Sequence, residues 1–282
     1  MKIHTTAEDS APTAAPYDAN PIMLAIRGVE RLFAYVKPLA IVLLVASLLL
    51  VVLQMTPGMY PADQSPVETG GEQSQMNGGA IAAMALAILP LGLAGLLIFA
   101  GVILAFIFIA GVIDFSAAAA ARKRKVTLSE TMGEVMQNFW PYALMRVIVA
   151  VKIFLWSLLF IVPGIYFAYR YILSGVVFFA EGTRGNAALK RSLALTKNAW
   201  LTTVSSYGLL NLLTLGSVQM LSDAGTSAEL YSNYKNTVDG GKAHPRPHTI
   251  SWVSFAVTLL VAGLLLIGLM LLGIGAAFNT AP

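Results

Sequence analysis

The apolar run at residues 80–115 restricts the possible folds of this chain more than any other feature of its sequence. As one helix, its roughly 34 apolar residues would extend about 51 Å, whereas the hydrocarbon core of a bilayer is about 30 Å thick. Two crossings would need about 40 residues and a turn between them, and no polar turn interrupts the run. The run therefore predicts a single membrane crossing that extends beyond the bilayer and bends near Pro90.

The composition assigns the rest of the chain to the same environment. Hydrophobic residues make up 57% of the 282 residues and charged residues only 11%, against about 25% charged residues in a typical soluble domain. So few charges could not cover the surface of a soluble protein of this length. The absence of cysteine excludes disulfides, iron–sulfur clusters and thiol nucleophiles. We interpret the net charge of +4 as an orientation signal in the membrane and predict no nucleic-acid partner.

Six segments are apolar enough to cross a bilayer, and we predict an all-α, polytopic membrane protein with about six transmembrane helices. These segments are residues 38–55, 80–115, 142–162, 165–180, 201–221 and 250–277. The fourth has only about 16 residues, which is short for a span and would also suit a re-entrant segment. A full crossing is favoured because it keeps the basic residues that follow, such as Arg184, on the cytoplasmic side. Before it, Pro163 and Gly164 are expected to form a tight turn.

Outside the spans, we predict a disordered cytoplasmic tail at residues 1–20 and a single membrane domain over residues 21–282. The tail is polar and is interrupted by prolines. Two or three amphipathic helices are expected at the membrane surface, at residues 22–36, 128–139 and 186–199. The alternative for residues 22–36 is an N-terminal extension of the first span. The first of these carries its apolar residues at helical spacing, at Ile22, Ile26, Val29, Phe33 and Val36.

The distribution of lysine and arginine predicts which side of the membrane each loop faces. In the six-span arrangement, twelve of these residues lie on one side, three lie on the other, and three lie inside spans. The polar loop at residues 222–250 is then on the side with three. Because cytoplasmic loops carry the excess of positive charge, we predict a multi-pass protein of a bacterial inner membrane with both termini in the cytoplasm.

The stretch from residue 161 to residue 200 carries several motifs. They are Pro163-Gly164-Ile165-Tyr166, Arg170-Tyr171, Glu181 and Ala188-Leu189-Lys190-Arg191-Ser192. In this stretch the chain resembles a group of bacterial multi-span inner-membrane proteins, which includes the YciC-like uncharacterised proteins and the membrane domain fused to some glycerophosphodiester phosphodiesterases. The resemblance implies an integral membrane architecture without an established reaction. No phosphodiesterase domain is present, so the resemblance implies no catalytic residue.

Ionisable residues inside the predicted spans are the main candidates for a functional site, because a charge in hydrocarbon is costly without a partner. Asp114 and Arg146 lie toward the same face and form a candidate ion pair. Lys152 lies roughly 15 Å deep in its span and Arg170 roughly 9 Å deep, and neither has an evident acidic partner. Three interpretations of these two residues stay open: side chains that reach back to the membrane surface and hydrogen-bond to carbonyls and hydroxyls, a groove that binds anionic lipid headgroups, and a path for a solute or for protons.

Two functions are compatible with these residues. The first is a non-enzymatic accessory protein that binds anionic lipid or a partner membrane protein through the Arg170 region and the basic helix at residues 187–199. The candidate binding residues are Arg146, Lys152, Arg170, Lys190, Arg191 and Lys197. The alternative is a small-solute transporter or channel subunit, which would have a water-accessible cavity around Lys152.

The sequence contains no pattern that predicts catalysis or a metal site. Its three histidines include His244 and His248, but Pro245 and Pro247 prevent a regular helix from presenting this pair on one face. No nucleophile-elbow motif and no phosphate-binding loop is found. We therefore predict that the chain is not an enzyme and carries no cofactor.

Overall fold

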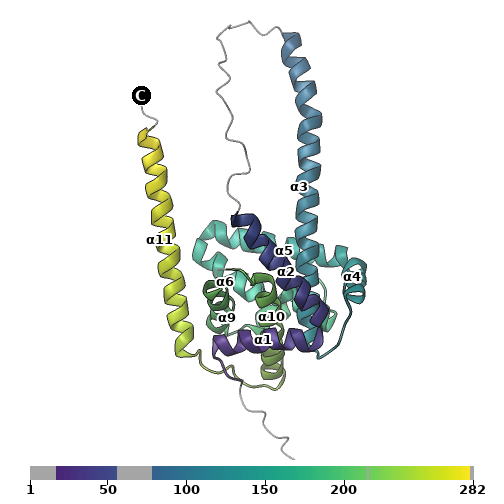
Figure 1. Cartoon of the computed structure of the whole chain (residues 1–282), viewed down its shortest axis with the longest axis vertical. Coiled ribbons are helices and arrows are strands. Elements are labelled where there is room, and N and C mark those ends of the chain that lie inside the picture. The colour runs from purple at the N-terminus through teal and green to yellow at the C-terminus, as the bar shows by residue number, and fades with distance from the viewer. Residues whose placement is uncertain (1–16, 56–77, 215, 280–282) are drawn as a thin grey trace, which may run out of the picture.

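The computed structural model describes residues 17–55, 78–214 and 216–279, and all regular structure in these residues is α-helical (Figure 1). The helices are α1 (Pro21–Tyr35), α2 (Lys37–Met55), α3 (Gly78–Ala121), α4 (Leu128–Gln137), α5 (Phe139–Leu159), α6 (Ile161–Tyr171), α7 (Ser174–Glu181), α8 (Asn186–Leu195), α9 (Trp200–Leu213), α10 (Gln219–Asp239) and α11 (Thr249–Asn279). For the described residues, the predicted all-helical class is therefore confirmed.

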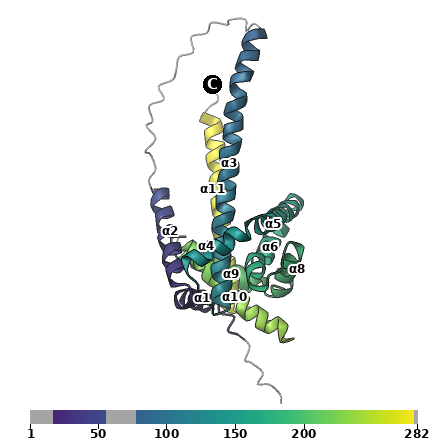
Figure 2. The ribbon, with the colours of Figure 1, turned by 90° about the vertical axis from the view of Figure 1, so that its right-hand side faces the viewer.

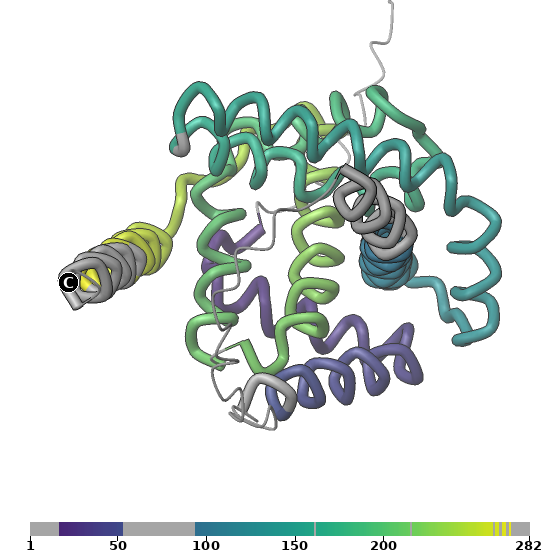
Figure 3. Tube along the Cα trace, turned by 90° about the horizontal axis from the view of Figure 1, so that it is seen from above, coloured from purple at the N-terminus to yellow at the C-terminus, as the bar shows by residue number. Residues whose placement is uncertain are grey.

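The helices form a body from which α3 and α11 extend in the same direction (Figures 1 and 2). Seen from above, these two helices are viewed nearly end-on, whereas α5, α9 and α10 lie across the line of view (Figure 3). Helix α2 rises obliquely along the body toward the same side (Figure 1). Helix α11 begins at the end of the body near Tyr17 and ends on the side where α3 begins, so α3 and α11 are antiparallel.

Three helical segments are long and apolar enough to cross a membrane. They are Ala94–Ala121, Phe139–Leu159 and Val162–Glu181. The described apolar parts of α2 and α11 are shorter, at Lys37–Val52 and Thr249–Val261. A membrane protein is therefore supported, and the predicted number of six spans is not confirmed.

Helix α3 is a single helix of 44 residues, in agreement with one crossing element instead of two. It continues through Pro90, where the sequence predicts a bend, without a break. Its described side chains fall into two zones: those at residues 94–106 are exposed, and those at residues 114–120 are buried. The buried zone packs against α7 and α10, so the end of α3 belongs to the core of the body and its exposed part projects beyond it.

The chain turns between α5 and α6 at Phe160, whose backbone is extended. Pro163 and Gly164 lie in the first turn of α6, so the prediction that they form the turn is wrong. Proline is tolerated there because the first N–H groups of a helix have no intrahelical partner. Gly164 serves the contact between the two helices, since a β-carbon there would lie 2.0 Å from Oγ of Ser157.

Two predicted spans are divided or shortened in the structure. The segment at residues 165–180 is divided between α6 and α7 by a break at Ile172 and Leu173. The segment at residues 201–221 contains α9, which has 14 residues. The first half of α9 is buried, and the helix packs against α1, α10 and α11. Because a perpendicular span needs about 20 residues, we interpret α9 as a core helix.

The prediction of a polar loop at residues 222–250 is wrong, because this segment contains most of α10. Helix α10 has 21 residues, and most of its first half is buried. Its closest approach to α1 joins two glycines: a β-carbon on Gly28 would lie 2.1 Å from the carbonyl oxygen of Gly225. Small residues allow such close backbone contact, and serine and threonine hydroxyls can bond back to their own helix. The low hydropathy of these residues is therefore compatible with a core position.

Helix α1 is also a core helix, where the sequence predicts a helix on the membrane surface. Leu24 and Leu32 are fully buried, and the helix packs mainly against α10 and α9. Ile26, which the sequence assigns to the apolar face, is 42% exposed. Arg31 forms an ion pair of 2.8 Å with the buried Glu229 of α10, so the polar side of α1 also faces the body.

Contacts within the body show that residues 222–250 lie on the same side of a membrane as the preceding basic helix, α8. Arg191, predicted to be cytoplasmic, donates to Asp239 at 2.6 Å. Tyr17, part of the predicted cytoplasmic tail, lies 3.2 Å from Nδ1 of His244. Side chains in such contact lie on one side, so the predicted placement of the loop is wrong. Residues 17–20 of the predicted tail are packed or capping residues, and residues 1–16 lie outside the described residues.

Candidate anion-binding site

A cavity of about 240 Å³ lies where the ends of α3 and α7 meet α4. Its apolar side chains include Phe115, Phe178 and Phe179. Its basic side chains are three arginines, Arg122, Arg124 and Arg184. Glu134 is the one acidic side chain among the described residues that line it. The cavity thus joins an apolar wall to a basic one at the end of a candidate membrane span.

Two helix ends bring the arginines to this cavity. Helix α3 ends in a turn at Lys123, which has a positive φ of 55°, and the N–H of Arg124 donates to the carbonyl oxygen of Ala119 at 2.9 Å. Helix α7 ends at Gly182, also with a positive φ, of 66°. Glycine suits this position because it has no steric penalty in the left-handed region. Arg184 lies two residues after this glycine.

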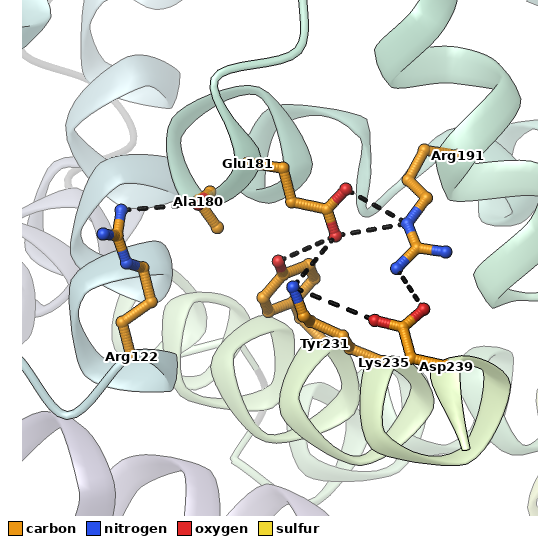
Figure 4. Close-up of polar contacts among 7 residues, drawn as sticks. All are labelled: Arg122, Ala180, Glu181, Arg191, Tyr231, Lys235 and Asp239. Carbon is orange, nitrogen blue, oxygen red and sulfur yellow. Dashed lines mark hydrogen bonds and ion pairs between the residues drawn. The ribbon is translucent and has the colours of Figure 1, made fainter.

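The three guanidinium groups differ in how far their charges are already paired. Arg122 donates to the carbonyl oxygen of Ala180 at 3.3 Å (Figure 4), and no carboxylate among the described residues pairs with it. Arg124 forms an ion pair with Glu130 in the first turn of α4. The guanidinium of Arg184 contacts no hydrogen-bond or ion-pair partner in the part of the chain that the structure describes. Arg122 and Arg184 are therefore available to an added anion.

A second group of charges lies beside this cavity and is balanced internally (Figure 4). Glu181 accepts hydrogen bonds from Arg191 at 3.1 Å and from the hydroxyl of Tyr231 at 3.0 Å. Arg191 also pairs with Asp239, and Lys235 lies 3.7 Å from Glu181. Burial and the Glu181 carboxylate raise the pKa of the Tyr231 hydroxyl, which therefore keeps the proton that it donates. Two carboxylates and two cations join α7, α8 and α10 into one unit.

Asp114 and Arg146, the candidate ion pair, are brought together inside the body. The hydroxyl of Tyr142 donates to Asp114 and accepts from Nε of Arg146, both at 2.6 Å. A β-carbon on Gly175 would lie 1.6 Å from the Asp114 carboxylate, so the glycine makes room for it. These contacts satisfy both charges within the fold, and we interpret the cluster as structural.

Lys152 and Arg170 also have internal partners in the structure. Nζ of Lys152 donates to Oδ1 of Asn186 at 3.0 Å. Arg170 donates to the carbonyl oxygen of Leu193 and to the hydroxyl of Tyr166, whose ring it also faces at 5.6 Å. These hydrogen bonds to neutral oxygens agree with the first of the three interpretations of Lys152 and Arg170. Neither residue lines a cavity described here.

The basic residues of α8 and of the turn after it are not equivalent to one another. Arg191 is bound in the charge network. Lys190 and Lys197 are exposed and lie on the surface of the body without a cavity of the Arg122 type. Lys197 lines a shallow hollow of about 260 Å³ with His244. The predicted binding residues therefore do not form one site.

The sequence interpretation missed the arginine cavity, because it treated residues 122–125 and Arg184 only as orientation signals. A signal was available: a basic cluster follows an apolar run directly, at the depth of lipid headgroups. Arg122 and Ala180 are 58 positions apart in the sequence, and this separation hid the fact that the ends of α3 and α7 meet. Among the described residues, no group of three or more His, Asp or Glu side chains could hold a metal ion.

Comparisons with known proteins add no assignment to this geometry. No family model, no curated protein and no solved structure matches the chain. The resemblance based on residues 161–200 therefore stays a prediction.

Proposed function

We propose that this chain is a non-enzymatic protein of a bacterial inner membrane that binds one anionic lipid by its phosphate, in the cavity lined by Arg122, Arg124 and Arg184. The observation that carries the proposal is a cavity with an aromatic wall that Arg122 and Arg184 both line, in which the Arg184 guanidinium has no partner among the described residues. The planar, fork-like guanidinium group matches the oxygens of a phosphate, and its charge persists at all physiological pH values.

The location of the cavity favours a lipid over a free anion. It lies beside α4, at the buried end of α3. The nearby helix α4 exposes Met132 and Met136, which are 42% and 66% exposed, and acyl chains can cover such residues. The transporter alternative has less support, because Lys152 is bonded to Asn186 and lines none of the cavities described here.

We further propose a three-crossing topology, in which α2, α3 and α11 cross and the body lies against the cytoplasmic face of the membrane. The candidate segment Phe139–Leu159 then lies along the membrane surface instead of crossing, with its exposed apolar side chains, such as Leu144 and Leu158, against the lipid (Figure 3). The directions of α3 and α11 and the exposed apolar part of α3 support this topology (Figure 2). All 18 lysines and arginines then belong to one side, and none lies in α2 after its first residue, in α3, in α11 or in residues 56–77. This division follows the positive-inside rule more closely than the six-span arrangement. The C-terminus would be outside the cytoplasm.

The test measures lipid binding to variants with equal losses of charge. The double substitution Arg122→Gln with Arg184→Gln should lower the amount of bound phosphatidylglycerol or cardiolipin by about tenfold or more, because two charge-assisted hydrogen-bonding groups are lost. Native mass spectrometry of the purified protein, with lipid titrated into the micelle, gives the bound fraction.

The matched control is the double substitution Lys190→Gln with Lys197→Gln, which removes the same charge from exposed positions of the body. It should leave lipid binding within about twofold of the unaltered protein, because neither lysine lines the arginine cavity. If the control lowered lipid binding and the arginine variant did not, the lipid site would not be the cavity. It would then lie at the exposed lysines of α8 and of the turn after it.

A further inference from the structure

A second cavity, of about 400 Å³, lies between α2, α3 and the beginning of α10. Its wall is apolar, with Leu50 and Val51 from α2 and Phe106, Ile109 and Ile113 from α3. Apolar surface on the same helices is exposed. Leu49, next to the lining residue Leu50, is 58% exposed, and the lining residue Phe106 is 66% exposed. The cavity therefore adjoins surface that only a hydrocarbon environment would cover favourably. A volume of this size can accommodate a small organic molecule.

One carboxylate, that of Asp223, lines this cavity, and the neutral polar side chains of Ser47 and Gln219 lie in the same lining. It accepts a hydrogen bond from the side-chain amide of Asn211 at 3.2 Å and another from Gln219. No lysine, arginine or histidine is among the described residues that line the cavity. Asp223 is half-buried. The two buried carboxylates described above, Asp114 and Glu229, each have an arginine partner. Asp223 is thus held by neutral donors and faces space instead of a cation.

Such an arrangement has a cost that a ligand could offset. A buried carboxylate without a counter-charge is destabilising, and burial raises the pKa of Asp223 to about 6 against the opposing hydrogen bonds. The other titratable groups that interact with it are hydroxyls, those of Tyr169 on α6 and Tyr207 on α9. At neutral pH the group is mostly ionised, and a positive charge placed in the cavity would have a direct partner.

From this geometry we infer that the cavity binds a lipophilic organic cation, which enters from the bilayer, contacts the apolar walls on α2 and α3, and pairs with Asp223. Shape and charge act on different parts of the ligand: the walls bind its apolar groups, and the carboxylate selects its charge. An anion or a neutral lipid chain gains nothing from Asp223. This site is separate from the arginine cavity, because the two cavities share no lining residue.

The experiment uses radiolabelled tetraphenylphosphonium and the full chain in detergent micelles, with equilibrium dialysis at pH 7.5. We expect saturable binding, at least about tenfold weaker for Asp223→Asn, since one buried charge pair is lost. Ala110→Phe, which fills the cavity from α3, should weaken binding similarly. Tetraphenylborate, which has the same shape and the opposite charge, should not compete. Lowering the pH to 5 should weaken binding to the unaltered protein and leave binding to Asp223→Asn unchanged.

The control is Glu30→Gln, which removes an exposed carboxylate of α1 and should not change binding. Circular dichroism and size-exclusion chromatography show whether each variant is folded. The pH dependence of the unaltered protein tests the inference even where a variant does not fold. Equal binding to folded Asp223→Asn, competition by tetraphenylborate, or no saturable binding at all would each overturn the inference.

Discussion

Single residues in the body show two ways of keeping a carboxylate away from water. Asp114 and Glu229 are each paired with an arginine, Arg146 and Arg31, so their charges are compensated inside the fold. Asp223 is held only by neutral hydrogen-bond donors. The first arrangement gives each carboxylate a cationic partner, whereas the second favours a protonated carboxyl group.

A pH-dependent stability follows for Asp223. Because its pKa is raised from 3.8 to about 6, the folded state binds the proton more tightly than the unfolded state. The free energy of unfolding should therefore fall by roughly 2 kcal/mol as the pH rises from about 4 to above 6. The thermal midpoint at pH 7.5 should lie below that at pH 5. Scanning fluorimetry in one detergent at both pH values measures the difference.

Asp223→Asn should remove most of this pH dependence, since asparagine keeps the size and cannot ionise. Glu30→Gln should keep it, because Glu30 is exposed. An unchanged midpoint difference in Asp223→Asn would assign the pH dependence to other groups.

At the scale of the helices, close contacts between backbones organise the body. The crossing of α1 and α10 depends on Gly28 and Gly225, and the crossing of α5 and α6 depends on Gly164 beside Ser157. These glycines lie within helices, where they lower intrinsic helix stability by about 1 kcal/mol each. Their presence is explained by the contact, because any side chain at these positions would separate the two helices.

We predict that Gly28→Ala destabilises the protein by about 2–3 kcal/mol, because the new β-carbon overlaps the carbonyl oxygen of Gly225 and forces the two helices apart. Gly133→Ala is the matched control: a β-carbon there meets no atom within 4 Å. The control should be neutral or stabilising by about 0.5–1 kcal/mol. Denaturant unfolding followed by circular dichroism compares the two, and equal stability of both variants would contradict the packing explanation.

For the whole molecule, the main feature is the division between a helical body that carries the lysines and arginines and the apolar helices that leave it. Helices α3 and α11 project from the body in the same direction (Figures 1 and 2). The arginine cavity lies where the buried end of α3 meets α7. The Asp223 cavity lies where α2 and α3 pass the start of α10. Both cavities therefore depend on how the apolar helices leave the body.

The proposed three crossings predict the location of the C-terminus. Alkaline phosphatase fused after Pro282 should be active, because this enzyme folds only outside the cytoplasm, and green fluorescent protein at the same position should be dark. The same fusions after Arg124 should give the reverse pattern. A fluorescent fusion after Pro282 would restore an even number of crossings and contradict the proposed topology.

The sequence by itself determined the environment and the element type. The low charge content and the run at residues 80–115 predict a helical membrane protein, and the structure has one continuous helix there. Periodicity also located helices at residues 128–139 and 186–199 to within a few residues. These properties depend on the local order of apolar and polar residues, which hydropathy measures directly.

Only the tertiary structure decided which helices lie in the core and which charges remain available. The small polar residues of α10 have the low hydropathy of a loop. They are buried because Gly28 and Gly225 allow the backbones of α1 and α10 to meet. Arg191 is neutralised by Asp239, 48 residues away, whereas Arg184 is not. Hydropathy sums over neighbours in sequence, but burial and charge pairing depend on neighbours in space, which the chain acquires only on folding.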